Sequence, residues 1–389
     1  MSSGGREEVD AVSVLDHLIV RAIKTRASDV HIEPRREGLH VRFRIDGVLT
    51  PQGTLPSEVA MSLVSRVKVL ARMDMTERRL PQDGQFSQED SRGALVHLRA
   101  STFPSSHGET LVLRVLQGHQ LFPIQKLGLE DSQRERLTAL CNRTNGLVLV
   151  CGPTGSGKTS TLYSPLRVVD TAQRSVITLE DPIEVDLPEV TQGQTNSRTG
   201  FSFATGLRAI LRQDPDVIFV GEMRDSETAQ IASQASLTGH LVFSTLHTSD
   251  VIETVIRLID LGVEPWIVAN SLLAIVAQRL VRVLCSCATS SEVGIDLHDD
   301  AGLLLLPKGT KVRMPGKCDK CHQSGYRGRT GIFEAVLVDD ELRELVKGRA
   351  PKKAFVDHLR KGGHVPLRQA GLRRVRDGLT SLEEVLRVT

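Results

Sequence analysis

A glycine-rich turn between an apolar run and a helical pattern is the clearest chemical signal in the sequence. It comprises Gly152, Pro153, Thr154, Gly155, Ser156, Gly157, Lys158 and Thr159. In such a G-x4-G-K-[ST] turn, glycines let successive backbone amides face phosphate oxygens without a Cβ in the way. The lysine reaches the β- and γ-phosphates, the threonine hydroxyl ligates Mg²⁺, and the following helix directs its positive end at the anion. The sequence therefore predicts an ATP and Mg²⁺ site at Lys158 and Thr159.

Two acidic segments follow apolar strands after this turn. In IFVGEMRD (residues 218–225) a glycine stands where an aspartate often ends the strand, and Glu222 comes next. A carboxylate at that edge, facing the nucleotide, polarises the attacking water. In ITLEDPIE (residues 177–184) Glu180 and Asp181 follow a strand and precede a proline. Alone this pair is equally typical of a solvated turn, but beside a phosphate loop it predicts support for Mg²⁺.

Two histidines flank a later strand in TGHLVFSTLHT, residues 238–248. Ligands of open α/β sheets bind beyond the carboxyl ends of the strands. His247, which follows the strand, is therefore the candidate to contact the γ-phosphate. A structural cap on the sheet is the alternative for His247 and for His240.

Four of the six cysteines form two pairs. Cys285 and Cys287 precede Cys318 and Cys321 by about thirty residues. Four thiolates in two pairs predict a closed, tetrahedral structural Zn²⁺ site. The first pair has one intervening residue where two are usual, so a loop that has lost its metal is the alternative. The remaining two cysteines stand apart and are predicted to be small buried apolar residues.

Alternating strands and helices position these groups. The expected strands are LVLV (147–150), SVITL (175–179), VIFV (217–220) and LVFSTL (241–246). This alternation is typical of a parallel sheet with helices on both faces. We expect this α/β P-loop domain over residues 121–280, a cysteine module over 281–335 and a helical C-terminal region over 336–389. The apolar stretch of residues 263–280 reads as a helix with Trp266 in the core.

The first 120 residues have a different pattern. Residues 11–24 and 58–73 have apolar positions at helical spacing, while residues 39–49 alternate apolar and basic side chains and contain an Asp-Gly turn. Such alternation is typical of a half-buried strand that enters a hairpin. The sequence predicts a small α+β domain over residues 1–120, joined by a linker near residues 118–128.

Bulk composition limits the classes of function. The net charge is +2 and aromatic residues make up 3% of the chain, which argue against a nucleic-acid partner. No apolar run approaches the roughly 20 residues that a membrane helix needs. The N-terminus is polar and has no signal-peptide core. We therefore expect a cytoplasmic protein with reduced cysteines, whose contact with a membrane is indirect, through partners.

The four motifs, in this order, resemble the ATPases of type II secretion and type IV pilus assembly. The resemblance extends to ASDVHIEP and VRFRIDGVL near the start and to DGLTSLEEVLRVT at the end, so it covers nearly the whole chain. It implies a RecA-like P-loop domain preceded by a PAS-like α+β domain. It also implies a homo-hexameric ring that hydrolyses ATP to assemble pilin-like subunits by rotating an inner-membrane platform protein, peripheral to the inner membrane.

The same resemblance implies that arginines of the N-terminal domain complete the nucleotide site. Arg42 and Arg44 share one face of their expected strand, and Arg66 and Arg79 are further candidates. The planar guanidinium group, with its several N–H donors, neutralises charge on a phosphoryl group during transfer. The alternative for each of them is a solvated basic face.

The resemblance leaves several functions open. The second cysteine pair, followed by GYRGRTGIFE, resembles the zinc module of the assembly ATPases, and pilus-retraction ATPases lack this module. Protein secretion is therefore the first expectation and pilus assembly the second. The familiar members carry an extra N-terminal domain that docks on the platform, whereas this chain begins almost directly at its first helix, as a fragment or a shorter branch. A DNA-translocating ATPase and an inactive nucleotide-gated scaffold are the alternatives from other classes.

Overall fold

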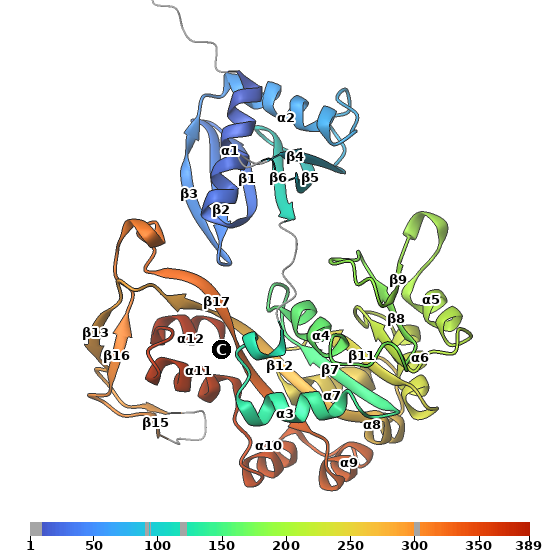
Figure 1. The fold of residues 1–389 in the computed structure, drawn as a ribbon. Coiled ribbons are helices and arrows are strands. Elements are labelled where there is room, and N and C mark those ends of the chain that lie inside the picture. Colours follow the sequence, from blue (N-terminus) through green and yellow to red (C-terminus); the bar gives the residue numbers. More distant parts are fainter. Residues whose placement is uncertain (1–9, 90–92, 94, 117–122, 299–303) are drawn as a thin grey trace, which may run out of the picture. The chain divides into compact units, whose positions relative to one another are not determined.

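The computed structural model describes residues 10–89, 93, 95–116, 123–298 and 304–389. The chain divides into two compact units, Met1–His119 and Gln120–Thr389, and each is considered by itself (Figure 1). The linker expected near residues 118–128 begins outside the described residues.

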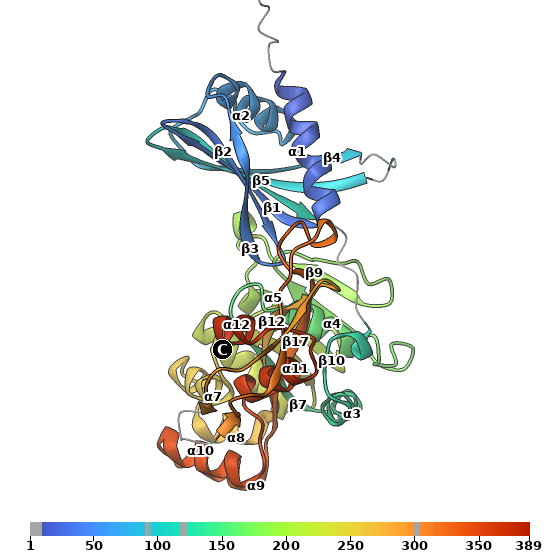
Figure 2. The same cartoon turned by 90° about the vertical axis from the view of Figure 1, so that its left-hand side faces the viewer.

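The first unit is an antiparallel sheet with two helices on one face (Figure 2). Its strands, in the spatial order β3-β2-β1-β6-β5-β4, are β1 (Ala27–Arg35), β2 (Gly38–Ile45), β3 (Val48–Leu55), β4 (Gln82–Glu89), β5 (Leu95–Ser105) and β6 (Gly108–Leu116). The helices are α1 (Ala11–Thr25) and α2 (Glu58–Leu70). Apolar residues of both helices share one core with alternate residues of the strands.

Strand β2 has the alternation expected from its sequence. Val41 and Phe43 are buried in the core of this unit, whereas Arg42 lies on the other face. The turn to β3 uses Asp46 and Gly47, both with positive φ, as a two-residue hairpin requires. The predicted hairpin and its two faces are confirmed.

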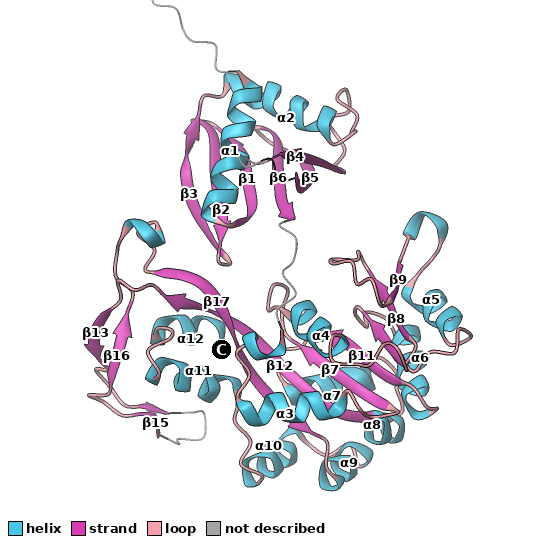
Figure 3. Ribbon diagram, in the orientation of Figure 1, coloured by secondary structure: helices cyan, strands magenta, loops and turns pink. Residues whose placement is uncertain are grey.

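The second unit is built on a seven-stranded sheet in the order β17-β12-β7-β11-β10-β8-β9 (Figure 3). The strands are β7 (Gly146–Cys151), β8 (Val176–Glu180), β9 (Thr191–Gln194), β10 (Val217–Val220), β11 (Leu241–Leu246), β12 (Leu272–Leu284) and β17 (Tyr326–Leu337). All neighbours are parallel except β17, which is antiparallel to β12. The expected α/β fold with a parallel sheet is confirmed.

Helices cover both faces of this sheet. They are α3 (Asp131–Leu140), α4 (Lys158–Leu166), α5 (Phe203–Ile210), α6 (Ser226–Leu237), α7 (Val251–Asp260), α8 (Pro265–Ser271), α9 (Asp340–Lys347), α10 (Lys352–Lys361), α11 (Leu367–Arg376) and α12 (Leu382–Val388), with short 3-10 turns at Ile124–Lys126, Ser197–Thr199 and Asp319–Cys321. Strand β7 shows why its sequence is apolar throughout. Leu147 and Leu149 enter one core and Val148 and Val150 enter the other, so every side chain is buried.

The prediction for residues 263–280 was wrong. Helix α8 ends at Ser271, and β12 then crosses the sheet between β7 and β17. A continuous buried apolar run is compatible with either a helix or a central strand, and pairing with two neighbours decides for the strand. Trp266 lies on α8 with 55% of its surface exposed, so it is not a core residue.

The cysteine segment is an excursion between β12 and β17. It contains two small antiparallel pairs, β13 (Thr289–Glu292) with β16 (Lys311–Met314), and β14 (Leu297–His298) with β15 (Leu304–Leu306). Strand β12 continues across residue 280, so the excursion starts from the same strand that lies beside the phosphate loop. Across the described residues, no helix is long and apolar enough to cross a membrane.

Candidate functional site

The glycine-rich turn connects the end of β7 to the start of α4. Gly152 and Gly157 have φ values of 151° and 88°, which L side chains rarely adopt. A Cβ on Gly152 would lie 2.6 Å from the carbonyl oxygen of Gln278, and one on Gly157 would lie 2.9 Å from its Nε2 atom. Backbone conformation and close packing therefore both require glycine at these two positions.

The turn has the features of a phosphate cradle. The hydroxyl of Ser156 is buried and has no hydrogen-bond partner within the described ranges. The Lys158 ammonium donates to the carbonyl oxygens of Gly152 and Pro153, at 2.7 and 3.1 Å, and so closes across the loop. Burial lowers the pKa of Lys158 to about 8, although the Glu222 carboxylate acts in the opposite direction. A phosphate group would satisfy the serine hydroxyl and stabilise the lysine charge, so these residues fit ATP.

The acids and histidines expected in the site follow the carboxyl ends of neighbouring parallel strands. Glu180 ends β8, Glu222 follows β10, and His247 follows β11. The strand order places β10 between β8 and β11, and β11 beside the β7 strand that leads into the phosphate loop. These residues consequently gather at the edge of the sheet where ligands of open α/β folds bind.

Glu222 and His247 are in direct contact. His247 Nε2 lies 3.2 Å from Glu222 Oε2, and Arg224 lies 2.5 Å from the other carboxylate oxygen. The Glu222 side chain is 12% exposed, and the hydrogen bond from Thr245 to the Gly221 carbonyl, at 2.8 Å, ties together the ends of β10 and β11. Arg224 and His247 thus hold the Glu222 carboxylate in one orientation at this edge of the sheet. Sequence reasoning missed Arg224, although it lies within the same motif.

Glu180 is more enclosed than its sequence context suggested. Its carboxylate is buried and accepts hydrogen bonds from the Tyr163 hydroxyl, from Thr178 at 2.6 Å and from Gln192 at 3.0 Å. Burial and the bond to Glu180 raise the pKa of Tyr163. The carboxylate thus joins α4, β8 and β9, while the adjacent Asp181 is exposed.

His240 precedes β11, at the opposite end of the strand from His247. Its Nδ1 atom lies 3.0 Å from the carbonyl oxygen of Ala235, the residue that also accepts a bond from the His240 amide. This histidine therefore caps the end of α6. His240 thus has a structural contact with a helix end in place of the expected cap on the sheet, whereas His247 lies with Glu222.

The four paired cysteines converge in space. Their sulfur atoms all lie within 4.8 Å of one another, with 3.8 Å between Cys285 and Cys318, 3.8 Å between Cys287 and Cys321, and 3.6 Å between Cys318 and Cys321. A tetrahedral zinc ion with Zn–S bonds of about 2.3 Å requires sulfur separations of about 3.8 Å. The short first pair therefore fits a closed four-thiolate site.

The surroundings of the sulfurs also suit a metal. The backbone amide of Gly325 donates to Cys321 Sγ at 3.2 Å. The backbone amide of Cys287 lowers the pKa of Cys285 to about 6, whereas desolvation raises the pKa of Cys287 to about 12. A bound cation would draw off the remaining protons, because thiolates are the ligating form.

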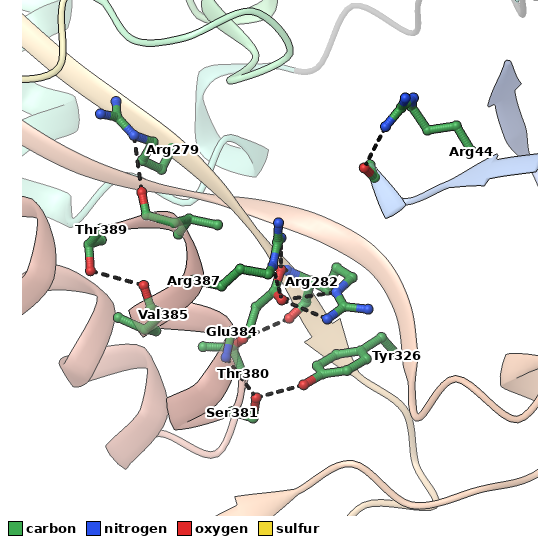
Figure 4. Close-up of polar contacts among 12 residues, drawn as sticks. Arg44, Arg279, Arg282, Tyr326, Thr380, Ser381, Glu384, Val385, Arg387 and Thr389 are labelled. Carbon is green, nitrogen blue, oxygen red and sulfur yellow. Dashed lines mark hydrogen bonds and ion pairs between the residues drawn. The ribbon is translucent and has the colours of Figure 1, made fainter. Parts of the chain in front are cut away.

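The arginines proposed for the N-terminal domain are engaged within their own sheet. Arg42 pairs with Glu33, and Arg44 lies 3.7 Å from Asp29. Arg44 also donates to the Gly47 carbonyl at 3.1 Å (Figure 4). Arg114 on β6 donates to the other oxygen of Asp29 at 2.9 Å. The pairing of β6 with β1 thus brings Arg114, which the sequence did not single out, to the same carboxylate as Arg44. The alternation of apolar residues around Arg114 in LVLRVL could have indicated that it shares this face. Of the other two candidates, Arg66 lies on α2 and Arg79 follows that helix, so neither belongs to this sheet face.

Comparison with known proteins assigns the chain to a family. A family model described as type II/IV secretion system protein matches residues 6–387. The chain is 46% identical to the type II secretion system ATPase E of Vibrio cholerae over 98% of its length and 76% of the relative. It is 43% identical to the type IV pilus assembly ATPase TfpB of Acinetobacter baylyi, over 97% of the chain and 65% of the relative.

Solved structures agree with this assignment. The pilus retraction motor PilT with bound ADP matches with a TM-score of 0.63 and 28% identity, over 96% of each chain. The predicted resemblance is confirmed, and with it the expectation of an ATPase that uses ATP and Mg²⁺. The chain belongs to the type II/IV secretion system family of ATPases.

Proposed function

We propose that this chain is a hexameric motor that hydrolyses ATP to assemble pilin-like subunits for type II protein secretion across the outer membrane. The observation that carries the proposal is the contact between Glu222 and His247, at the sheet edge next to the buried Lys158. The relatives named for type II secretion supply the transport context. Type IV pilus assembly is the second candidate, favoured by the similarity to TfpB.

In this proposal each side chain of the P-loop unit has a separate task. The backbone N–H groups of the loop residues 154–157 and the Lys158 ammonium hold the phosphates, and the Thr159 hydroxyl ligates Mg²⁺. Glu222 accepts a proton from the attacking water, while His247 holds the carboxylate in place and contacts the γ-phosphate. Glu180 supports the Mg²⁺ side of the site through the neighbouring β8 end.

Further components are proposed on the same basis. Arg42 and Arg44 complete the nucleotide site, and six copies of the chain form a ring. Four cysteines hold one structural Zn²⁺ that keeps the excursion between β12 and β17 folded. The domains are taken as residues 1–120, 121–280, 281–335 and 336–389. The ring acts in the cytoplasm on an inner-membrane platform protein, without direct contact with nucleic acid.

The test is steady-state ATP hydrolysis as a function of protein concentration, for the wild type and for Glu222→Gln. We expect specific activity that rises with concentration, because sites are completed between subunits. Removing the base should lower kcat by about a hundredfold or more. The control is Glu135→Gln, which changes an exposed acid on α3 and should leave kcat unchanged.

Either of two results would count against the motor. Equal turnover by the Glu222→Gln variant would remove this residue as the base. Specific activity independent of concentration would argue against sites completed by neighbouring subunits. Complementation of cells that lack the chain distinguishes the two candidate functions. Restored release of proteins into the medium indicates secretion, and restored surface pili indicate pilus assembly.

A further inference from the structure

Gln278 lies on β12, beside the phosphate loop. Strand β12 is parallel to β7, with Ala277 opposite Cys151, so Gln278 lies next to the first residue of the loop. Gln278 is 2% exposed, and its partner on β17 is the buried Phe333. A buried polar side chain in such a place requires partners.

The side chain of Gln278 contacts the helix that starts at the loop. Its Oε1 atom accepts a hydrogen bond of 2.7 Å from the Thr161 hydroxyl, and both groups are buried. Thr161 is on α4, one turn after Lys158. The bond therefore fixes the first turn of α4 against β12, and the first turn carries the lysine and the threonine of the P-loop.

The same residue also packs against both ends of the loop. A Cβ on Gly152 would come within 2.6 Å of the Gln278 carbonyl oxygen, and one on Gly157 within 2.9 Å of Nε2. The carbonyl oxygen and the side-chain amide of Gln278 thus limit how closely the loop can approach β12. Neither contact involves the phosphates themselves.

The backbone of Gln278 is held in turn by its neighbour. The Arg279 guanidinium donates to the Gln278 carbonyl at 3.0 Å and to the Ser249 carbonyl at 2.8 Å. It also donates to the Val388 carbonyl, at 3.2 Å, in the C-terminal helix (Figure 4). Ser249 follows the strand end that carries His247. The position of the phosphate loop is thereby tied to the segment that bears the histidine.

We propose that Gln278 is a positioning residue, which acts through Thr161 and the loop glycines to hold the P-loop in its nucleotide-binding shape. The inference rests on the proposed role of the loop in binding ATP phosphates. A leucine would leave the Thr161 hydroxyl buried without a partner, so the helix would shift or admit water. The hydrogen bond between Thr161 and Gln278 therefore stabilises the shape of the loop, and its loss should weaken nucleotide binding.

The test uses the full chain and MgADP as the probe, with affinity measured by calorimetry and folding by thermal unfolding without nucleotide. We expect Gln278→Leu and Thr161→Val each to weaken MgADP binding by about tenfold. The double variant should bind like either single variant, because both remove the same bond. The control Thr161→Ser keeps the hydroxyl and should bind like the wild type.

Other outcomes overturn the inference. If the two single effects multiply in the double variant, the residues act independently. If Gln278→Leu lowers the unfolding temperature but leaves MgADP affinity unchanged, its role is purely structural. Should Gln278→Leu fail to fold, Thr161→Val must weaken binding and Thr161→Ser must restore it, or the proposal fails. Lys158→Ala tests the loop separately. Unchanged MgADP binding by that variant would refute the proposed phosphate site, and the role of Gln278 with it. Weaker binding by Lys158→Ala together with wild-type binding by Gln278→Leu would refute the role of Gln278 alone.

Discussion

Replacing one buried carboxylate, Glu384, should destabilise the second unit more than any surface charge. Glu384 is fully buried on α12, and Arg282 of β12 donates to it from its backbone amide, its Nε and its terminal nitrogen, at 3.1, 3.0 and 2.7 Å (Figure 4). Arg387 adds two further bonds, at 3.0 and 2.7 Å. The guanidinium of Arg282 also lies 3.9 Å from the ring centroid of Tyr326, on β17.

The substitution Glu384→Gln keeps the shape and removes the charge. Breaking a buried ion pair by removing one partner costs about 3–5 kcal/mol. The Arg387 side chain is 47% exposed and can be hydrated, so we expect a loss near the lower limit, about 3 kcal/mol. With a urea m-value of about 3 kcal/mol per M, the midpoint should fall by about 1 M.

The single tryptophan makes this measurement selective. Trp266 lies in the second unit, so its fluorescence during urea unfolding reports that unit alone. The matched control is Glu383→Gln, which changes the exposed neighbour in the same helix and should shift the midpoint by less than about 0.2 M. Equal shifts for the two variants would refute the reasoning, since they would show that the arginine contacts contribute nothing beyond surface charge.

The contacts of Glu384 with Arg282 and Arg387 also predict how the stability difference between the wild type and Glu384→Gln depends on pH. Burial acts to raise the pKa of Glu384, but hydrogen bonds from Arg387 and Arg282 outweigh it and hold the pKa below its usual value. A depressed folded-state pKa gives stability that is present above the unfolded value of about 4.3 and is lost as pH falls through the folded value. The gap between wild type and Glu384→Gln should therefore narrow below about pH 4.3.

Two further predictions concern the nucleotide loop and the cysteines. Burial holds the pKa of Lys158 near 8, so MgADP affinity should fall as pH rises above about 8, and binding should be accompanied by proton uptake. Calorimetry in buffers of different ionisation enthalpy measures both the affinity and the proton uptake. An affinity that stays constant up to about pH 9.5 would contradict the role of Lys158 in phosphate binding. Elemental analysis of the purified chain should find about one zinc per chain. Cys321→Ser should lose the zinc and unfold at a lower temperature, whereas Cys141→Ser, outside the cluster, should retain the zinc. Wild-type protein without zinc would contradict the site.

Short stretches of sequence were enough to predict the local chemistry. The phosphate loop lies within eight consecutive residues, and the positive φ values of Gly152 and Gly157 already favour glycine at these positions. The strands of the sheet were recognisable because a strand buried on both faces is apolar at every position. On β2 the alternation of Val41, Arg42 and Phe43 was sufficient to assign its two faces.

Contacts between distant residues could not be predicted in this way. His247 contacts Glu222 across 25 positions, because β10 and β11 are neighbours in the sheet. The enclosure of Glu180 depends on β9, which the sequence pattern did not reveal. The one-residue spacing of Cys285 and Cys287 left zinc binding open, and only the return of the chain at β17 brings the second pair to it.

The sequence alone determined the phosphate loop, the parallel-sheet class and the family, because each is encoded in residues that are adjacent or regularly spaced. Only the tertiary structure decided that residues 272–284 form a central strand, and that Gln278 and Arg282 on it bond to Thr161 and Glu384, 117 and 102 positions away. Such bonds follow from the order in which strands pair. Strand order reflects the burial of whole faces of the sheet, which no local window of sequence contains.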